Sequence, residues 1–216
     1  MVDYFLNQCD YYIYSARILL TKSKYKRKII NLKKFLNQTV IVSGGATGLG
    51  LSIVKAYLFE GANVVICGRR KSILEKSIND LIMIDENYKN QLLSLKTDMS
   101  DEDEVTNLFH QAEEKFSYVN ILVNNAGIWL ETPLVECTSE EIDLMYNNNL
   151  KATIIGTKIA GLKLADRGAI INLGSFAGIL SIRSASMYST FKAAISHFTK
   201  ASASELAERE IRVNCV

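Results

Sequence analysis

The sequence predicts an α/β fold with a doubly wound parallel sheet, and three observations support this prediction. Short β-branched runs alternate with longer amphipathic stretches, which is the pattern of repeated strand–helix units. A glycine cluster at residues 44–50 follows the first run and opens the first amphipathic stretch. The chain has 216 residues with 48% hydrophobic content. This is enough for one α/β domain with a substantial core, but too little for two large ones.

The expected elements alternate along the chain. Strands are expected at residues 39–43, 63–67, 92–97, 120–124, 168–173 and 211–215. Helices are expected at residues 48–59, 72–84, 101–116, 139–164 and 186–208. The only proline, Pro133, falls in the loop after the fourth strand. We expect a Rossmann-like strand order of 3-2-1-4-5-6, helices on both faces, and a ligand site at the carboxyl ends of the strands.

The glycine cluster has the spacing G-x-x-x-G-x-G, formed by Gly44, Gly48 and Gly50. Glycine permits a sharp turn and a close approach of the backbone to a pyrophosphate, and the following helix offers free amides to the anion. A merely flexible loop would also be rich in glycine. The strand before the cluster and the helix after it favour a dinucleotide site.

A second motif combines Tyr188 and Lys192, four residues apart, with Ser175 thirteen residues upstream of the tyrosine. Positions i and i+4 share one face of a helix, so the phenol and the ammonium become neighbours. The ammonium favours the phenolate form, and Tyr188 would then serve as a general acid and base toward a hydroxyl or carbonyl oxygen. Such pairs also occur on solvated helix faces, and the spacing by itself is weak evidence.

Together these motifs resemble the short-chain dehydrogenase/reductase family, in its single-domain branch of the 3-oxoacyl-carrier-protein reductase type. The resemblance runs from about residue 35 to the end, and the motifs stand in the family's order. It implies an oxidoreductase that transfers a hydride between a nicotinamide coenzyme and a carbonyl or secondary alcohol. The implied catalytic residues are Asn149, Ser175, Tyr188 and Lys192.

The resemblance also implies a coenzyme site. Its residues are Ser43, Gly44, Gly48, Leu49, Gly50, Asp98, Asn125, Ala126 and Gly127, with Tyr188 and Lys192 from the catalytic set. Asp98 would meet the adenine ring. Two positions depart from the family pattern, because Ser43 stands where threonine is usual and Ala152 where glycine is frequent.

The end of the second expected strand bears on coenzyme choice. A site for NAD places a carboxylate there, which binds the ribose diol and repels a 2′-phosphate. This chain has Gly68 at that position, followed by Arg69 and Arg70. Guanidinium groups bind phosphate through a planar fork, so we expect NADP to be preferred, with NAD possible. The alternative interpretation is that Arg69 and Arg70 are solvated residues of a loop and bind no phosphate.

Composition excludes several other classes. The net charge of +2 predicts no nucleic-acid partner. The four cysteines are scattered without a C-x-x-C pair, which predicts neither a metal site nor a disulfide framework and suits the cytoplasm. No apolar run reaches the roughly 18 residues of a membrane span.

The first 34 residues differ from the remainder and are expected to be a basic, aromatic-rich extension before a domain at 35–216. Residues 1–36 contain eight lysines and arginines against two aspartates, a net charge of +6. Five of the ten tyrosines fall within the first 25 residues. A docking arm for a membrane surface or a partner is an alternative to a loosely ordered extension.

The family continues after the sixth strand with a Pro-Gly turn, a substrate lid and a final strand. None of these follows Val216, so we expect a C-terminally truncated domain that lacks the final strand. The substrate therefore cannot be identified from the sequence, although Trp129 and Arg183 are expected near its pocket. A catalytically inactive NADP-binding sensor or scaffold is the alternative function. Small residues on the last helix suggest a homodimer or homotetramer.

Overall fold

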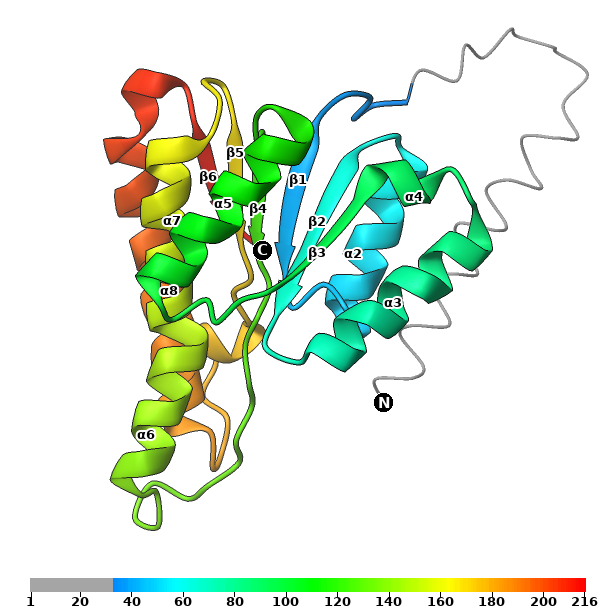
Figure 1. Cartoon of the computed structure of the whole chain (residues 1–216). Helices are drawn as coiled ribbons and strands as arrows, with labels where there is room; N and C mark the ends of the chain where they lie inside the picture. Colours follow the sequence, from blue (N-terminus) through cyan, green and yellow to red (C-terminus); the bar gives the residue numbers. More distant parts are fainter. Residues whose placement is uncertain (1–32) are drawn as a thin grey trace, which may run out of the picture. The chain divides into compact units, whose positions relative to one another are not determined.

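A computed structural model describes residues 33–216, which fold around one six-stranded parallel sheet (Figure 1). The strands lie in the order β3-β2-β1-β4-β5-β6, and every neighbouring pair is parallel. Their bounds are β1 Thr39–Ser43, β2 Asn63–Gly68, β3 Leu92–Lys96, β4 Ile121–Asn124, β5 Ala169–Asn172 and β6 Arg212–Cys215. The predicted doubly wound fold is confirmed. Except for Lys33 and Lys34, the predicted N-terminal extension lies outside the described residues.

Helices cover the two faces of this sheet (Figure 1). One face carries α2 (Gly48–Phe59) and α3 (Lys71–Ile84), and the short α4 (Tyr88–Gln91) follows them. The other face carries α5 (Glu102–Phe116), α7 (Ala152–Lys163) and α8 (Ser186–Glu205). The switch between faces comes between β1 and β4, where the strand order reverses. Loops at the carboxyl ends of the strands diverge there and leave room for a ligand.

The core is two apolar layers, one on each side of the sheet. Successive side chains of a strand point to opposite faces, so Val40 and Val42 join the layer under α2 and α3, while Ile41 joins the layer under α5 and α7. All three are fully buried. Because both faces are covered, the central strands β1, β2 and β4 are mostly runs of apolar, often β-branched residues. The sequence pattern of the strands is therefore explained by burial on both sides.

One predicted helix is not regular. The segment predicted as a single helix at 139–164 consists of α6 (Ser139–Met145), a π-helical stretch at Tyr146–Lys151, and α7. A π turn accommodates one more residue than an α turn, so the apolar spacing on either side still suggests a continuous helix. The last predicted helix is also shorter, because α8 ends at Glu205 and a 3₁₀ turn at Ala207–Arg209 leads into β6.

Candidate active site

The glycine turn between β1 and α2 is shaped by two left-handed residues. Gly44 has φ of 64° and Gly48 has φ of 53°, a region that side-chain-bearing residues rarely adopt. Gly50 is required for a different reason, because a Cβ at this position would overlap the carbonyl oxygen of Gly44. The turn is therefore closed tightly upon itself at the start of α2. The N-cap residue of α2, Thr47, makes no side-chain capping hydrogen bond, and an anion is favoured at such a helix N-terminus.

Ser43 and Asn125 hold this turn against the end of β4. The Ser43 hydroxyl accepts hydrogen bonds from the backbone N–H groups of Asn125 and Ala126, both at 3.0 Å. In return, Nδ2 of Asn125 donates to the Ser43 carbonyl oxygen at 2.8 Å. Ser43 is 1% exposed and lies behind the turn. It supports the predicted coenzyme site from below and does not line it.

A cavity of about 580 Å³ opens at this edge of the sheet. That volume lies within the usual range of about 300–1,000 Å³ for small-molecule sites. Predicted coenzyme residues that line it are Gly44, Leu49, Gly50, Arg69, Arg70, Asp98, Asn125, Ala126 and Gly127. They come from the ends of β1, β2, β3 and β4, which meet at the switch point (Figure 1).

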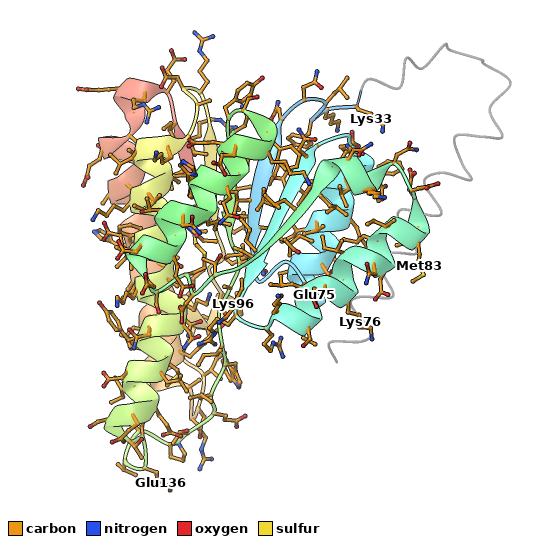
Figure 2. The ribbon with its side chains drawn as sticks, viewed as in Figure 1. Lys33, Glu75, Lys76, Met83, Lys96 and Glu136 are labelled. Carbon is orange, nitrogen blue, oxygen red and sulfur yellow. The ribbon has the colours of Figure 1, made fainter. Side chains whose placement is uncertain are left out.

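Charged groups gather at one end of the cavity, after β2 and β3. Arg69 Nη1 lies 4.0 Å from Asp98 Oδ2. Lys96, which closes β3 just before Asp98, is labelled in Figure 2. Burial acts to raise the pKa of Asp98, but two hydrogen bonds from Ser100 and the positive charges of Arg69 and Lys151 outweigh it, and the pKa is lowered. Asp98 is therefore a carboxylate that holds Arg69 at the mouth of the cavity.

Tyr188, Lys192 and Ser175 do not line this cavity, but Lys192 lies close to Gly127, which does. Lys192 Nζ lies 5.6 Å from the centre of the Tyr188 ring and donates to the Leu173 carbonyl oxygen at 2.7 Å. The lysine is 6% exposed, and burial lowers its pKa, although the Cys215 thiol partly opposes this. The Ser175 hydroxyl caps the 3₁₀ turn Phe176–Gly178 by accepting from the Ala177 N–H at 3.1 Å.

Asn149 lies in the π-helical stretch and is fully buried. Its Oδ1 accepts from the Ile128 N–H at 3.1 Å, and its Nδ2 donates to the Met145 carbonyl oxygen at 3.0 Å. A Cβ added to Gly127 would lie 2.7 Å from Asn149 Oδ1 and 3.9 Å from Lys192 Nζ. The side-chain amide thus braces the loop after β4, beside the lysine.

This chain is similar to known proteins in sequence and in fold. The sequence pattern of short chain dehydrogenases matches residues 38–216. This chain belongs to the short chain dehydrogenase family. An uncharacterised oxidoreductase of Mycobacterium bovis is 34% identical over 181 residues, which is 83% of this chain and 71% of that relative.

Two further proteins support the family assignment. An NADP-dependent (R)-specific alcohol dehydrogenase of Lentilactobacillus kefiri is 32% identical over 184 residues, 83% of this chain and 71% of its own length. The crystal structure of a short chain dehydrogenase from Mycobacterium smegmatis superposes with a TM-score of 0.79 at 31% identity, covering 86% of this chain and 77% of that one. As a short chain dehydrogenase, the chain is an NAD(P)-dependent oxidoreductase.

Sequence reasoning missed the apolar part of the cavity lining in this short chain dehydrogenase. Ile73 and Leu74 come from α3, Cys67 from the end of β2, and Met99 from the segment after β3. Such residues resemble any other core positions in the sequence. Cys67 is fully buried, and burial raises the pKa of its thiol to about 12. The thiol therefore stays protonated at neutral pH and contributes to the cavity only as an unreactive lining residue.

Within residues 33–216, no group of histidine, cysteine and carboxylate side chains has an arrangement that could hold a metal ion. No helix in the same range has both the length and the apolar content to cross a membrane.

Proposed function

We propose that this chain transfers a hydride between NADP(H) and the carbon of a carbonyl group or secondary alcohol, with Ser175, Tyr188 and Lys192 acting on the substrate oxygen. One observation carries the proposal. Lys192 is a buried ammonium held by the Leu173 carbonyl, with the Tyr188 ring 5.6 Å away, at the end of the cavity marked by Gly127. A structural lysine on a helix surface would not be buried in this way.

The cavity fits a dinucleotide. Gly50 has no side chain, and a Cβ at this position would overlap the Gly44 carbonyl oxygen. The absence of side chains in the turn lets its backbone approach a pyrophosphate closely. The cavity continues from this turn to Arg69 on one side and to Gly127 on the other. Bound there, the reduced coenzyme would supply the hydride. Asp98 and Leu49 would contact its adenosine end, and Ala126 and Gly127 would border its nicotinamide end.

The chain's own residues would handle the proton and the developing charge. In the reducing direction, Tyr188 donates a proton to the substrate carbonyl oxygen, and the neighbouring ammonium of Lys192 favours the phenolate that remains. Ser175 donates a hydrogen bond to the same oxygen and stabilises its negative charge as it grows. Asn149 holds the loop after β4 through Ile128, and it would connect Lys192 to a water for reprotonation.

Three features favour NADP over NAD. Gly68 occupies the position where a carboxylate would repel a 2′-phosphate. Arg69 and Arg70 both line the cavity next to it. The relative from Lentilactobacillus kefiri is described as NADP-dependent. Arg69 would be the main ligand of the phosphate and Arg70 a second one.

The test begins with coenzyme binding. Titration with NADPH and with NADH, followed by the fluorescence of the reduced coenzyme, should show tighter binding of NADPH. The absorbance of NADPH is then followed with a panel of aldehydes and ketones, for the wild type and for Tyr188→Phe. Loss of the catalytic proton donor should reduce turnover by about 10²–10⁴-fold while NADPH binding persists. Equal turnover in the variant would refute the mechanism, and binding without any turnover would favour the sensor.

Assembly and location are further parts of the proposal. Ala193, Ala201 and Ser204 are exposed small residues on α8, and we propose that this helix packs against a second copy in a homodimer or homotetramer. Light scattering would decide between these states and a monomer. We also propose a cytoplasmic location, where free thiols such as those of Cys67, Cys137 and Cys215 persist, and a domain that begins at residue 35.

A further inference from the structure

The loop after β4 carries the only tryptophan of the chain, Trp129. Its ring packs edge to face against Tyr188, with centroids 4.6 Å apart and planes at 71°. Trp129 is nevertheless 45% exposed, so a large part of its ring is open beside the tyrosine. Aromatic pairs of this geometry contribute about 0.5–1.5 kcal/mol beyond the apolar area that they bury.

The position of Trp129 is fixed on both sides by hydrogen bonds. On one side, the N–H of its neighbour Ile128 donates to Asn149 Oδ1 at 3.1 Å. On the other side, the Thr132 N–H donates to the Ser184 carbonyl oxygen at 2.8 Å, and the Thr132 hydroxyl contacts Glu141 Oε1 at 3.2 Å. The loop then runs past Glu136, which is labelled in Figure 2, to the start of α6. The backbone on both sides of Trp129 is therefore held in place by hydrogen bonds.

The bond to Ser184 also joins this loop to the segment between Ser175 and Tyr188. That segment carries further exposed apolar side chains, namely Ile179 at 79%, Leu180 at 51% and Ile182 at 42% exposure. Both loops thus expose apolar side chains, and of these Trp129 contacts the ring of the proposed proton donor. None of these residues lines the coenzyme cavity.

From this arrangement we infer that Trp129 determines the substrate class: its open ring receives a flat, apolar substituent on the carbonyl carbon, so the enzyme prefers aryl ketones to small aliphatic ones. The inference rests on the proposed function. Trp129 has two effects in this arrangement. It binds the substituent by stacking, and it positions the Tyr188 ring by the edge-to-face contact. The first effect depends on the substrate, whereas the second acts on every substrate.

The test compares acetophenone, cyclohexyl methyl ketone and 2-butanone as substrates of the wild type, Trp129→Ala and Trp129→Phe. Acetophenone and cyclohexyl methyl ketone have similar size, but only the first is flat. In Trp129→Ala, the preference in kcat/KM for acetophenone over the other two should fall by about 2–10-fold, mainly through KM. Loss of positioning should lower kcat for all three by a similar factor. Trp129→Phe should recover most of both losses.

Controls separate this inference from a folding defect. Trp129 is half exposed and outside the coenzyme cavity, so the affinity for NADPH should be the same in all three proteins. An unchanged preference in Trp129→Ala, or an equal fall in kcat/KM for all three ketones, would overturn the assignment of specificity and leave the proposed function intact.

A second readout applies if the wild type reduces no ketone, a result that would contradict the proposed function. Because Trp129 is the only tryptophan, its fluorescence reports on this site alone. Saturable quenching by acetophenone, with only linear collisional quenching by cyclohexyl methyl ketone, would support the aromatic site. Linear quenching by both ketones would overturn it.

Discussion

The two halves of the sheet build their parts of the site by opposite means. In the half formed by β1, β2, β3, α2 and α3, the site depends on glycines, which have no side chain. Gly44 and Gly48 provide left-handed turns, and Gly50 leaves the space that a Cβ would fill. Beneath them the core is nearly all apolar, with Val40, Val42 and others fully buried.

The half formed by β4, β5, α7 and α8 depends on buried hydrogen bonds. Asn124 Nδ2 donates to Asn172 Oδ1 at 2.9 Å and to the Thr157 hydroxyl at 3.2 Å. Asn172 Nδ2 donates to the Thr199 hydroxyl at 3.0 Å. The same half contains Lys192, which is also buried. The half with the proposed coenzyme site (the coenzyme half) thus depends on close backbone packing at glycines, and the half with the proposed catalytic residues (the catalytic half) depends on buried hydrogen bonds. Substitutions in the two halves should therefore have different effects.

The largest effect is expected where the hydrogen-bond network is broken. Asn172 is fully buried, and Asn172→Ala leaves Asn124 Nδ2 and the Thr199 hydroxyl without this partner. The Thr157 hydroxyl also loses its bond to Asn172 Oδ1, and each of the three lost hydrogen bonds contributes about 0.5–1.5 kcal/mol net, so the free energy of unfolding should fall by about 2–4 kcal/mol. Urea denaturation followed by circular dichroism measures it. Asn214→Ala, at an exposed position in β6, is the control and should change it by less than about 0.5 kcal/mol.

In the coenzyme half, Gly50→Ala should act through crowding. Overpacking of this kind costs about 1–3 kcal/mol, and the displaced turn should also lose affinity for NADPH. The matched variant is Gly48→Ala, where a Cβ meets nothing within 4 Å and only the φ of 53° is unfavourable. That strain costs about 1–2 kcal/mol. Titration of both variants with NADPH checks the difference, and a greater loss of affinity in Gly48→Ala would contradict the crowding argument.

The contrast between the halves also explains what the sequence could predict. Glycines are visible in a sequence, and the turn was predicted from Gly44, Gly48 and Gly50. The strand order and the cavity edge were predicted from the alternation of strands and helices. Bonded arrangements are less visible. Nothing in the sequence near Asn149 indicated a π-helical stretch, because the apolar spacing before and after it fits one continuous helix. The contact between Trp129 and Tyr188 depends on the conformation of a loop, and the periodicity of a sequence does not predict loop conformations.

Lys192 allows a pH-dependent test of the catalytic half. Burial lowers its pKa in the folded protein, so between that pKa and the ordinary value of 10.5 the unfolded chain binds more protons. The stability contribution of Lys192 should therefore be unfavourable at neutral pH and should improve as the pH rises through this window. Lys192→Met lacks this improvement. It should be inactive, yet as stable as the wild type at pH 7 or more stable by about 1 kcal/mol.

The measurement is the difference in unfolding free energy between the wild type and Lys192→Met, determined by urea at several pH values up to 10. Taking the difference cancels the other groups that titrate in this range, such as the Cys67 thiol, whose pKa is raised to about 12. The advantage of the variant should shrink as the pH rises. A constant difference would show that the lysine carries no burial penalty.

The smallest effect should come from the exposed ion pair at the mouth of the cavity. Arg69 lies 4.0 Å from Asp98, and their side chains are 53% and 38% exposed. Exposed pairs of this kind contribute about 0.2–1 kcal/mol, so Asp98→Asn should free Arg69 for a 2′-phosphate by that amount. Loss of an adenine contact would weaken NADPH and NADH equally, whereas release of Arg69 helps NADPH alone. The ratio of the two affinities should therefore rise by about 1.5–5-fold in fluorescence titrations. If the ratio falls instead, Asp98 orients Arg69 toward the phosphate and does not compete with it.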